Sequence, residues 1–290
     1  MHAKWKIAFL PFLALLAAGS AAPAIAQAQV PRNPESIGPF QFSSAGTAAS
    51  EPEVLPGEPF PRNFIVADRD IYCQLRDGTY NGAPPEAIES QATFLLQEMA
   101  LFSGTEAERL LLRSRIAYYA GRCWNDHKNK KRAIPWLEQA VGTAQELLKL
   151  EGDTPRALVV YAEPLGELSI LKDIAFLVIH GPKVGQCATK ALNADPGNIR
   201  ALLLKANALA YPPPIWGGNY PKALESYAAI LRGAPPSGLP PDSLFDLRAG
   251  IATAYANLKQ VELARWWFSA ALELFPNNLY ATRELEKLQK

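Results

Sequence analysis

The residues of this chain that could carry out chemistry are few and scattered. Its 290 residues include three histidines and three cysteines. His127 lies in the charged segment HKNKKR and His180 in an apolar stretch, and neither has further ligands at the spacing that a metal site needs. The sequence also lacks a G-x-S-x-G elbow, an H-E-x-x-H helix and a phosphate-binding glycine loop. We therefore expect no catalysis, no metal and no cofactor.

One irregular segment has the composition of a contact surface. Residues 211–223, YPPPIWGGNYPKA, begin at Tyr211 and combine a stiff run of prolines with two glycines that permit positive φ. Trp216 offers a large flat surface with one hydrogen-bond donor, and such side chains are good contact anchors. Two interpretations stay open. Trp216 either contacts a partner or folds back and fills a gap between helices.

Residues that favour the start or the end of a helix predict the helices on which residues 211–223 depend for their position. Pro85 begins an amphipathic helix that ends before Gly104, and Thr105 with Glu108 forms a capping box for the next helix. The later boundaries are predicted from capping residues, glycines and prolines. They are a helix start at Pro155 capped by Asp153 or Thr154, an end or kink at Pro164, a break at Gly181–Pro182, a turn at 195–198, a cap at Asp242 or Ser243, and a final helix over 278–288.

Small and bulky residues recur at the spacing of helix-turn-helix units. Tyr255, Ala264, Phe268, Ala271 and Pro276 fall at the positions of one unit of about 34 residues. Three earlier units carry the matching anchors at 133, 184 and 223, with Leu171 and Ala175 placed on one first helix. One unit cannot bury its apolar face alone, so the units must stack. We predict an all-α fold, a superhelical stack of antiparallel helix pairs over residues 85–290.

This pattern resembles the tetratricopeptide repeat family over roughly residues 105–290. In that family the first helix of each pair lines a concave groove that binds protein or peptide partners. The resemblance implies a groove whose arginines could hold a carboxylate, and intramolecular or solvated partners for those arginines are the open alternative. The side chains at the expected groove positions are Arg115, Tyr118, Arg122, Asn125, Arg200 and Asn207.

The WGG element followed by a Lys-Ala pair is similar to a feature of another group, the periplasmic T component of tripartite ATP-independent periplasmic transporters. This second resemblance covers roughly residues 180–275 and implies contact with transporter subunits or with a small organic ligand. Members of that group are typically lipoproteins and often carry an acidic residue where Asn219 stands here. Ser20 occupies the place of the lipid-carrying cysteine, so a lipid anchor at this site is not expected.

The N-terminal residues have the pattern of a secretory signal peptide. Basic residues precede the apolar run IAFLPFLALLAA, and two A-x-A sites end at Ala26 and Ala28. The run is too short to cross a bilayer, so we expect cleavage of residues 1–28, no membrane span afterwards and a periplasmic or secreted protein. Two cysteines could pair in such a compartment, and among Cys73, Cys123 and Cys187 the pair Cys73–Cys123 is the first to consider.

Residues 29–84 are rich in proline, glycine and serine and are predicted to form a partly disordered linker. Two pieces of it, FIVADR and DIYCQL, either dock on the helical body or remain disordered. The formal net charge of +1 gives no reason to expect nucleic-acid binding. The sequence therefore predicts an exported scaffold that binds a protein or peptide, with a transporter-associated accessory protein as the alternative.

Overall fold

The computed structural model describes residues 66–233 and 239–289, and these residues form an all-helical fold without a strand. The predicted signal peptide and residues 29–65 of the predicted linker lie outside the described residues. The α-helices are α1 (Val66–Tyr80), α2 (Pro85–Glu98), α3 (Glu106–Asp126), α4 (Lys130–Glu151), α5 (Pro155–Leu171), α6 (Ile174–Ala194), α7 (Ile199–Ala210), α8 (Tyr220–Gly233), α9 (Pro241–Asn257), α10 (Val261–Leu272) and α11 (Leu279–Lys287), with short 3-10 helices η2 (Met99–Leu101) and η3 (Pro214–Trp216).

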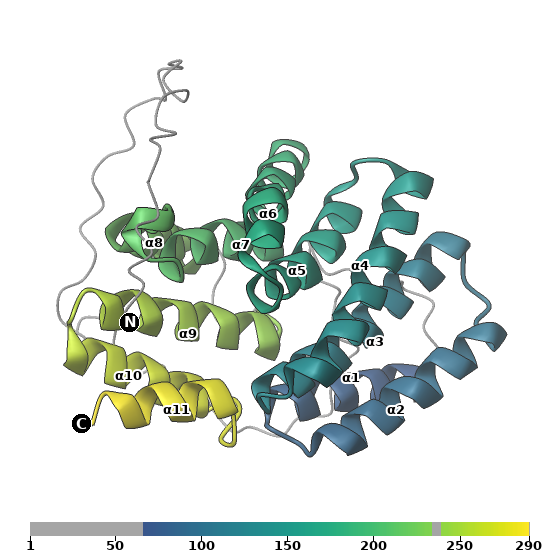
Figure 1. Ribbon diagram of the computed structural model, residues 1–290, viewed down its shortest axis with the longest axis horizontal. Helices are drawn as coiled ribbons and strands as arrows, with labels where there is room; N and C mark the ends of the chain where they lie inside the picture. Colours follow the sequence, from purple (N-terminus) through teal and green to yellow (C-terminus); the bar gives the residue numbers. More distant parts are fainter. Residues whose placement is uncertain (1–65, 234–238, 290) are drawn as a thin grey trace, which may run out of the picture.

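Each odd-numbered helix packs against the even-numbered helix that follows it, and the connections between consecutive helices are mostly short. α1, α3, α5, α7 and α9 also contact one another in this order and form an inner layer, while the even-numbered helices pack mainly on their neighbours in the sequence. The pairs follow a curve that brings the two ends of the helical region together (Figure 1). α1 consequently contacts α9 as well as α3.

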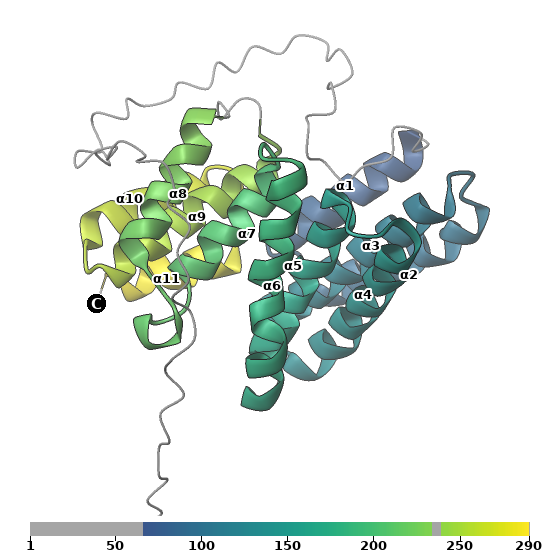
Figure 2. The ribbon, with the colours of Figure 1, turned by 90° about the horizontal axis from the view of Figure 1, so that it is seen from above.

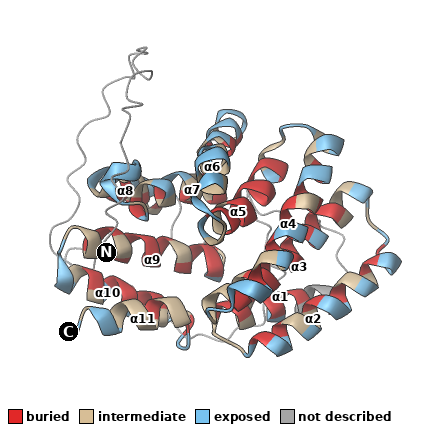
Figure 3. Cartoon of the chain, viewed as in Figure 1, coloured by how far each residue is buried: buried red, intermediate tan, exposed pale blue. Residues whose placement is uncertain are grey.

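The small residues that mark the predicted helix pairs lie where helices touch. Ala133, Ala223 and Ala264 are fully buried, whereas Val184, the anchor of the second predicted unit, is only partly buried. A Cβ atom on Gly121 of α3 would lie 2.7 Å from Cγ of Leu137 on α4, so only glycine permits this close approach. Figure 3 shows buried residues on the sides of the helices that face one another and exposed residues on their outer sides. The prediction of an all-α fold of packed helices is confirmed.

Most predicted caps are also present. The Glu108 amide donates to Oγ1 of Thr105 at 3.2 Å, and the Thr105 amide donates to the Glu108 carboxylate at 2.8 Å, which is the predicted capping box. Thr154 caps α5, Asn198 caps α7 and Asn278 caps α11. These short-range hydrogen bonds satisfy amides that have no partner within the helix.

The predicted helix end at Pro164 and the predicted break at Gly181–Pro182 are wrong. α5 continues through Pro164, and α6 continues through Gly181 and Pro182, so that Ala175 belongs to α6 rather than to the preceding helix. Proline removes one hydrogen bond to the carbonyl four residues earlier. For Pro182 that carbonyl is on Val178, whose residue is well exposed, so water can bind the carbonyl in place of the missing amide.

The start of α9 also differs from the prediction. α9 begins at Pro241 without a side-chain cap, and Asp242 and Ser243 lie inside its first turn. Their side chains contact Arg200 of α7 instead, with Nη1 of Arg200 lying 3.3 Å from Oγ of Ser243. A tertiary contact thus takes the place of the local cap.

The helical region begins at Val66 rather than at residue 85, because α1 lies within the predicted linker. Tyr72, Leu75 and Tyr80 of this helix are buried in the core. For the part of DIYCQL whose side chains are described, docking is therefore the correct alternative. No disulfide joins Cys73, Cys123 and Cys187 in this structure, so the Cys73–Cys123 pairing is not present.

Candidate functional site

The inner helices carry a buried network of charged side chains, and Glu163 on α5 is its centre. The Glu163 carboxylate accepts hydrogen bonds from Arg115 of α3 and, at 2.7 Å, from Nε of Arg200 of α7. All three side chains are almost fully buried. A buried charge is tolerated only when it is paired and hydrogen-bonded, so these ion pairs join α3, α5 and α7.

The network continues into α9 and α1 through Asp242. Nη1 of Arg200 lies 3.4 Å from Oδ2 of Asp242, and Nη1 of Arg76 on α1 lies 4.0 Å from Oδ1 of the same carboxylate. Burial raises the pKa of Asp242, but Arg200 and Arg76 outweigh burial and leave this pKa below its ordinary value. Asp242 is therefore ionised at neutral pH.

Tyr80 and Arg122 connect the first helix pair to the last. Nη1 of Arg122 donates to the Tyr80 hydroxyl at 2.9 Å, and the guanidinium carbon lies 4.2 Å from the centre of the Tyr80 ring. The Tyr80 hydroxyl donates to Oδ2 of Asp246 on α9 at 2.9 Å, while Nη2 of Arg122 lies 3.2 Å from Oδ1. Asn278 adds a 2.6 Å hydrogen bond from its side-chain amide to the Tyr80 carbonyl. The curve of helix pairs is thus closed by polar contacts.

Glu167 on α5 is a further buried acidic residue of this network. The Tyr118 hydroxyl donates to Oε1 of Glu167 at 3.0 Å, and Nε of Arg122 lies 3.8 Å from the same atom. Burial raises the pKa of Glu167 to about 7 despite these partners. The charge of the network therefore changes near neutral pH.

The expected groove residues lie on or beside this network. Arg115, Arg122 and Arg200 all have acidic partners within the chain, which is the alternative left open by the sequence. Tyr118 is buried. Oδ1 of Asn207 accepts a 2.6 Å hydrogen bond from the Tyr227 hydroxyl, and Asn125 is partly buried near the end of α3.

The acidic partners themselves were not identified from the sequence. Glu163 and Glu167 are four residues apart, and so are Asp242 and Asp246. This spacing places two side chains on one face of a helix. A carboxylate pair on one face of each of two helices, together with arginines on three others, is the pattern that could have revealed the network.

The connection between α7 and α8 is exposed, in contrast to the network. Tyr211, Ile215 and Trp216 are 42%, 87% and 53% exposed, so Trp216 does not fill a buried gap. The connection is held by hydrogen bonds, including one of 2.8 Å from the Asn219 amide to the Leu209 carbonyl. A Cβ atom on Gly218 would lie only 1.9 Å from the Pro212 carbonyl oxygen, so this tight fold requires glycine.

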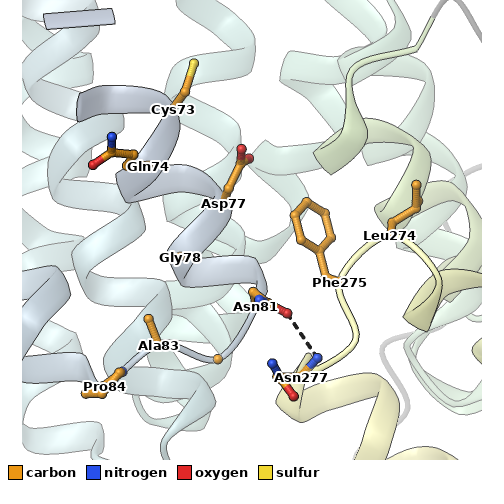
Figure 4. A pocket seen from close by; sticks show the side chains of 11 residues that line it. Cys73, Gln74, Asp77, Gly78, Asn81, Ala83, Pro84, Leu274, Phe275 and Asn277 are labelled. Atoms are coloured by element: carbon orange, nitrogen blue, oxygen red, sulfur yellow. Dashed lines mark hydrogen bonds between the residues drawn. The ribbon is translucent and has the colours of Figure 1, made fainter. Parts of the chain in front are cut away.

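An open cleft of about 990 Å³ lies at the junction of the two ends of the helical region. α1 and the turn after it form one wall, and the connection between α10 and α11 forms the other (Figure 4). The Asn277 amide donates to Oδ1 of Asn81 at 3.0 Å and bridges the two walls. Asp77, Asn81 and Phe275 give the lining one carboxylate, an amide and an aromatic ring, groups that can orient a small polar molecule.

No protein-family model matches this chain, and a search of curated proteins finds no significant match. Within residues 66–233 and 239–289, no group of three or more histidine, cysteine or acidic side chains is arranged to hold a metal ion. No helix in this part of the chain is long and apolar enough to cross a bilayer. The α7–α8 connection and the cleft are the two features described above that a ligand can reach without breaking the buried ion pairs.

Proposed function

We propose that this protein is an exported scaffold of stacked helix pairs, similar to tetratricopeptide repeat proteins, that binds a protein or peptide partner. The buried alanines at matching positions of three of the predicted helix pairs, Ala133, Ala223 and Ala264, support the repeat architecture. The observation that carries the binding function is the exposed connection between α7 and α8, with Ile215 and Trp216 open to solvent, while the ring of Tyr211 packs beside Tyr280. Aromatic side chains of this kind supply much of the energy at protein interfaces.

The inner face is a less suitable binding surface than this connection. A partner carboxylate could reach Arg115 or Arg200 only by displacing Glu163. Breaking a buried ion pair costs about 3–5 kcal/mol, which the new contact would have to recover. The α7–α8 connection can be covered without such a loss, so we place the main partner contact there.

The test is capture of the partner from the native cell envelope with the wild-type protein and with Trp216→Ala. If Trp216 is an interface anchor, the truncation should weaken binding at least about tenfold, with unchanged helicity and thermal stability. Trp266→Ala is the matched control, because Trp266 is a second partly exposed indole far from this connection in the sequence. If Trp216→Ala and Trp266→Ala weakened partner binding equally, or if Trp216→Ala unfolded, Trp216 would not be the interface anchor.

A second candidate function is a transporter-associated accessory protein that binds a small organic ligand. The cleft at the junction of the two ends favours it, since Asp77 and Phe275 could contact one ligand from opposite walls. A screen of small polar metabolites by thermal shift, with Asp77→Ala as the control, tests this candidate. A ligand that stabilises the wild type but not Asp77→Ala would favour it over the scaffold.

The proposed export has a separate test. Mass spectrometry of the protein from its native cells should give a mature N-terminus after Ala26 or Ala28. An intact N-terminus on the cytoplasmic side of the membrane would contradict export and leave the partner proposal standing.

A further inference from the structure

The first half of α6 exposes apolar side chains that a helix in a globular domain usually buries. Ile174, Val178 and Ile179 are 69%, 63% and 61% exposed, and Ile170 at the end of α5 is 74% exposed. No residue from 173 to 186 is buried. These four aliphatic side chains expose on the order of 400 Å² of apolar surface, a size at which a patch is often functional. Figure 2 shows α6 extending beyond its neighbours on the lower side of the molecule.

The charged residues of α6 are all basic. Its 21 residues contain Lys183 and Lys190 but no aspartate or glutamate. Lys190 pairs with Asp153, while Lys183 forms no ion pair with the described residues and lies near the apolar turns. This helix therefore combines exposed apolar side chains with basic residues in its second half, while its exposed cap Asp173 is the one carboxylate next to the apolar turns in the sequence.

The neighbouring turn between α3 and α4 adds more positive charge. Lys128, Lys130 and Lys131 are exposed, and none of them forms an ion pair with the described residues. The nearby carboxylate of Glu89 is already bound by Arg132 and by the indole of Trp124. The HKNKKR segment thus carries three exposed lysines without an ion-pair partner among the described residues, with Asp126 beside Lys128 as the nearest carboxylate in the sequence.

This lysine cluster and the apolar turns of α6 lie on the same edge of the molecule. Lys172, in the turn between α5 and α6, forms an ion pair with Glu138 in the third turn of α4. The α3–α4 turn and the α5–α6 turn are therefore neighbours. We call this region, formed by Lys128, Lys130, Lys131, Ile170 and residues 174–183, the basic apolar edge.

We propose that the basic apolar edge docks on an anionic lipid surface. The exposed aliphatic side chains of α6 would enter the boundary between headgroups and acyl chains, and the lysines would contact the headgroups. Apolar insertion and a polybasic patch are each weak signals, and stable attachment to a bilayer needs two such signals together. The inference goes beyond the proposed scaffold function, which does not depend on it.

Two observations favour a lipid surface over a protein. Solvent reaches the first turns of α6 on several sides, and a bilayer can surround such a projection while a protein groove covers one face. A symmetric contact with a second copy would also bring two lysine clusters into one interface, which is repulsive. An anionic surface has the complementary charge.

The experiment is flotation of the purified full chain, processed as in its native cells, with vesicles of phosphatidylcholine alone or with 30 mol% phosphatidylglycerol added. We expect binding to the anionic vesicles that weakens as the salt concentration rises. Changing Lys128, Lys130 and Lys131 to glutamine should reduce partitioning by about fivefold per lysine, roughly a hundredfold in total. The double variant Ile174→Ser/Val178→Ser should also lose most binding.

Matched controls come from the other end of α4, where Lys149 and Leu150 are also exposed. Lys149→Gln and Leu150→Ser should bind vesicles like the wild type. All variants carry the same N-terminal segment, so any contribution of that segment to vesicle binding is the same in each of them. Trp216→Ala should keep vesicle binding, so failure of the partner assignment and failure of lipid docking are distinguishable.

Equal binding to neutral and anionic vesicles, or unchanged binding of the lysine variant, would overturn the proposal. The proposal would also be overturned if the protein did not bind vesicles and light scattering showed a dimer that the Ile174→Ser/Val178→Ser variant does not form. That last result would assign the exposed face of α6 to a second copy of this chain.

Discussion

Replacing Glu163 by glutamine should destabilise the protein strongly, because this carboxylate pairs with two buried guanidinium groups. The side chains of Glu163, Arg115 and Arg200 are only 6%, 4% and 7% exposed. Removing one partner of a buried pair costs about 3–5 kcal/mol, since the remaining charge is left without compensation. Glutamine keeps one acceptor oxygen but no charge, so we expect a loss of about 4 kcal/mol from a total stability of about 5–15 kcal/mol.

The assay is equilibrium unfolding in urea followed by circular dichroism, with Glu138→Gln as the control. Glu138 pairs with Lys172 at the surface, so its loss should change the free energy of unfolding by less than about 1 kcal/mol. The double variant Arg115→Met/Glu163→Gln should lose less than the sum of the two single changes, because it removes one of the uncompensated charges. A Glu163→Gln variant as stable as Glu138→Gln would refute the assignment of Glu163 as the centre of the network.

Three further predictions concern stability. The free energy of unfolding should fall by up to about 3 kcal/mol between pH 5 and pH 8, because the pKa of Glu167 is raised from 4.5 in its ordinary state to about 7 and the folded state binds the extra proton. Thermal melting across this range should show a smaller pH dependence in Glu167→Gln, and an identical dependence would contradict the assignment. Asn278→Ala should cost about 2–3 kcal/mol, since it removes the cap of α11 and the hydrogen bond to the Tyr80 carbonyl; Asn278→Asp keeps the cap but loses the donor to Tyr80, so an Asn278→Asp variant as stable as the wild type in urea would rule out a role for the Tyr80 contact. Ala264→Glu should unfold the α9–α10 pair, because Ala264 is fully buried and a carboxylate there has no room or partner; circular dichroism should show lost helicity, and unchanged melting would refute this placement.

The fold class and many of the helix boundaries were predictable because they depend on short-range interactions. Thr105 and Glu108 satisfy amides within one turn of themselves, so their pattern is readable without the rest of the chain. The alanines at 133, 223 and 264 mark close helix contacts because only small side chains fit there. The same local reasoning failed at Pro182, which lies in an exposed part of α6 where a lost hydrogen bond costs less than in the core.

The sequence by itself determined that this chain forms packed helices and that its inner helices carry arginines. Only the tertiary structure decided what those arginines bind, since Arg200 reaches Glu163 across 37 positions and Arg122 reaches Asp246 across 124. Curvature accumulates over all helix pairs and finally brings Tyr80 beside Asp246 (Figure 1). No local sequence pattern encodes this accumulated curvature. The inner face, which the sequence predicts as an open groove, is therefore lined by buried ion pairs in the folded protein.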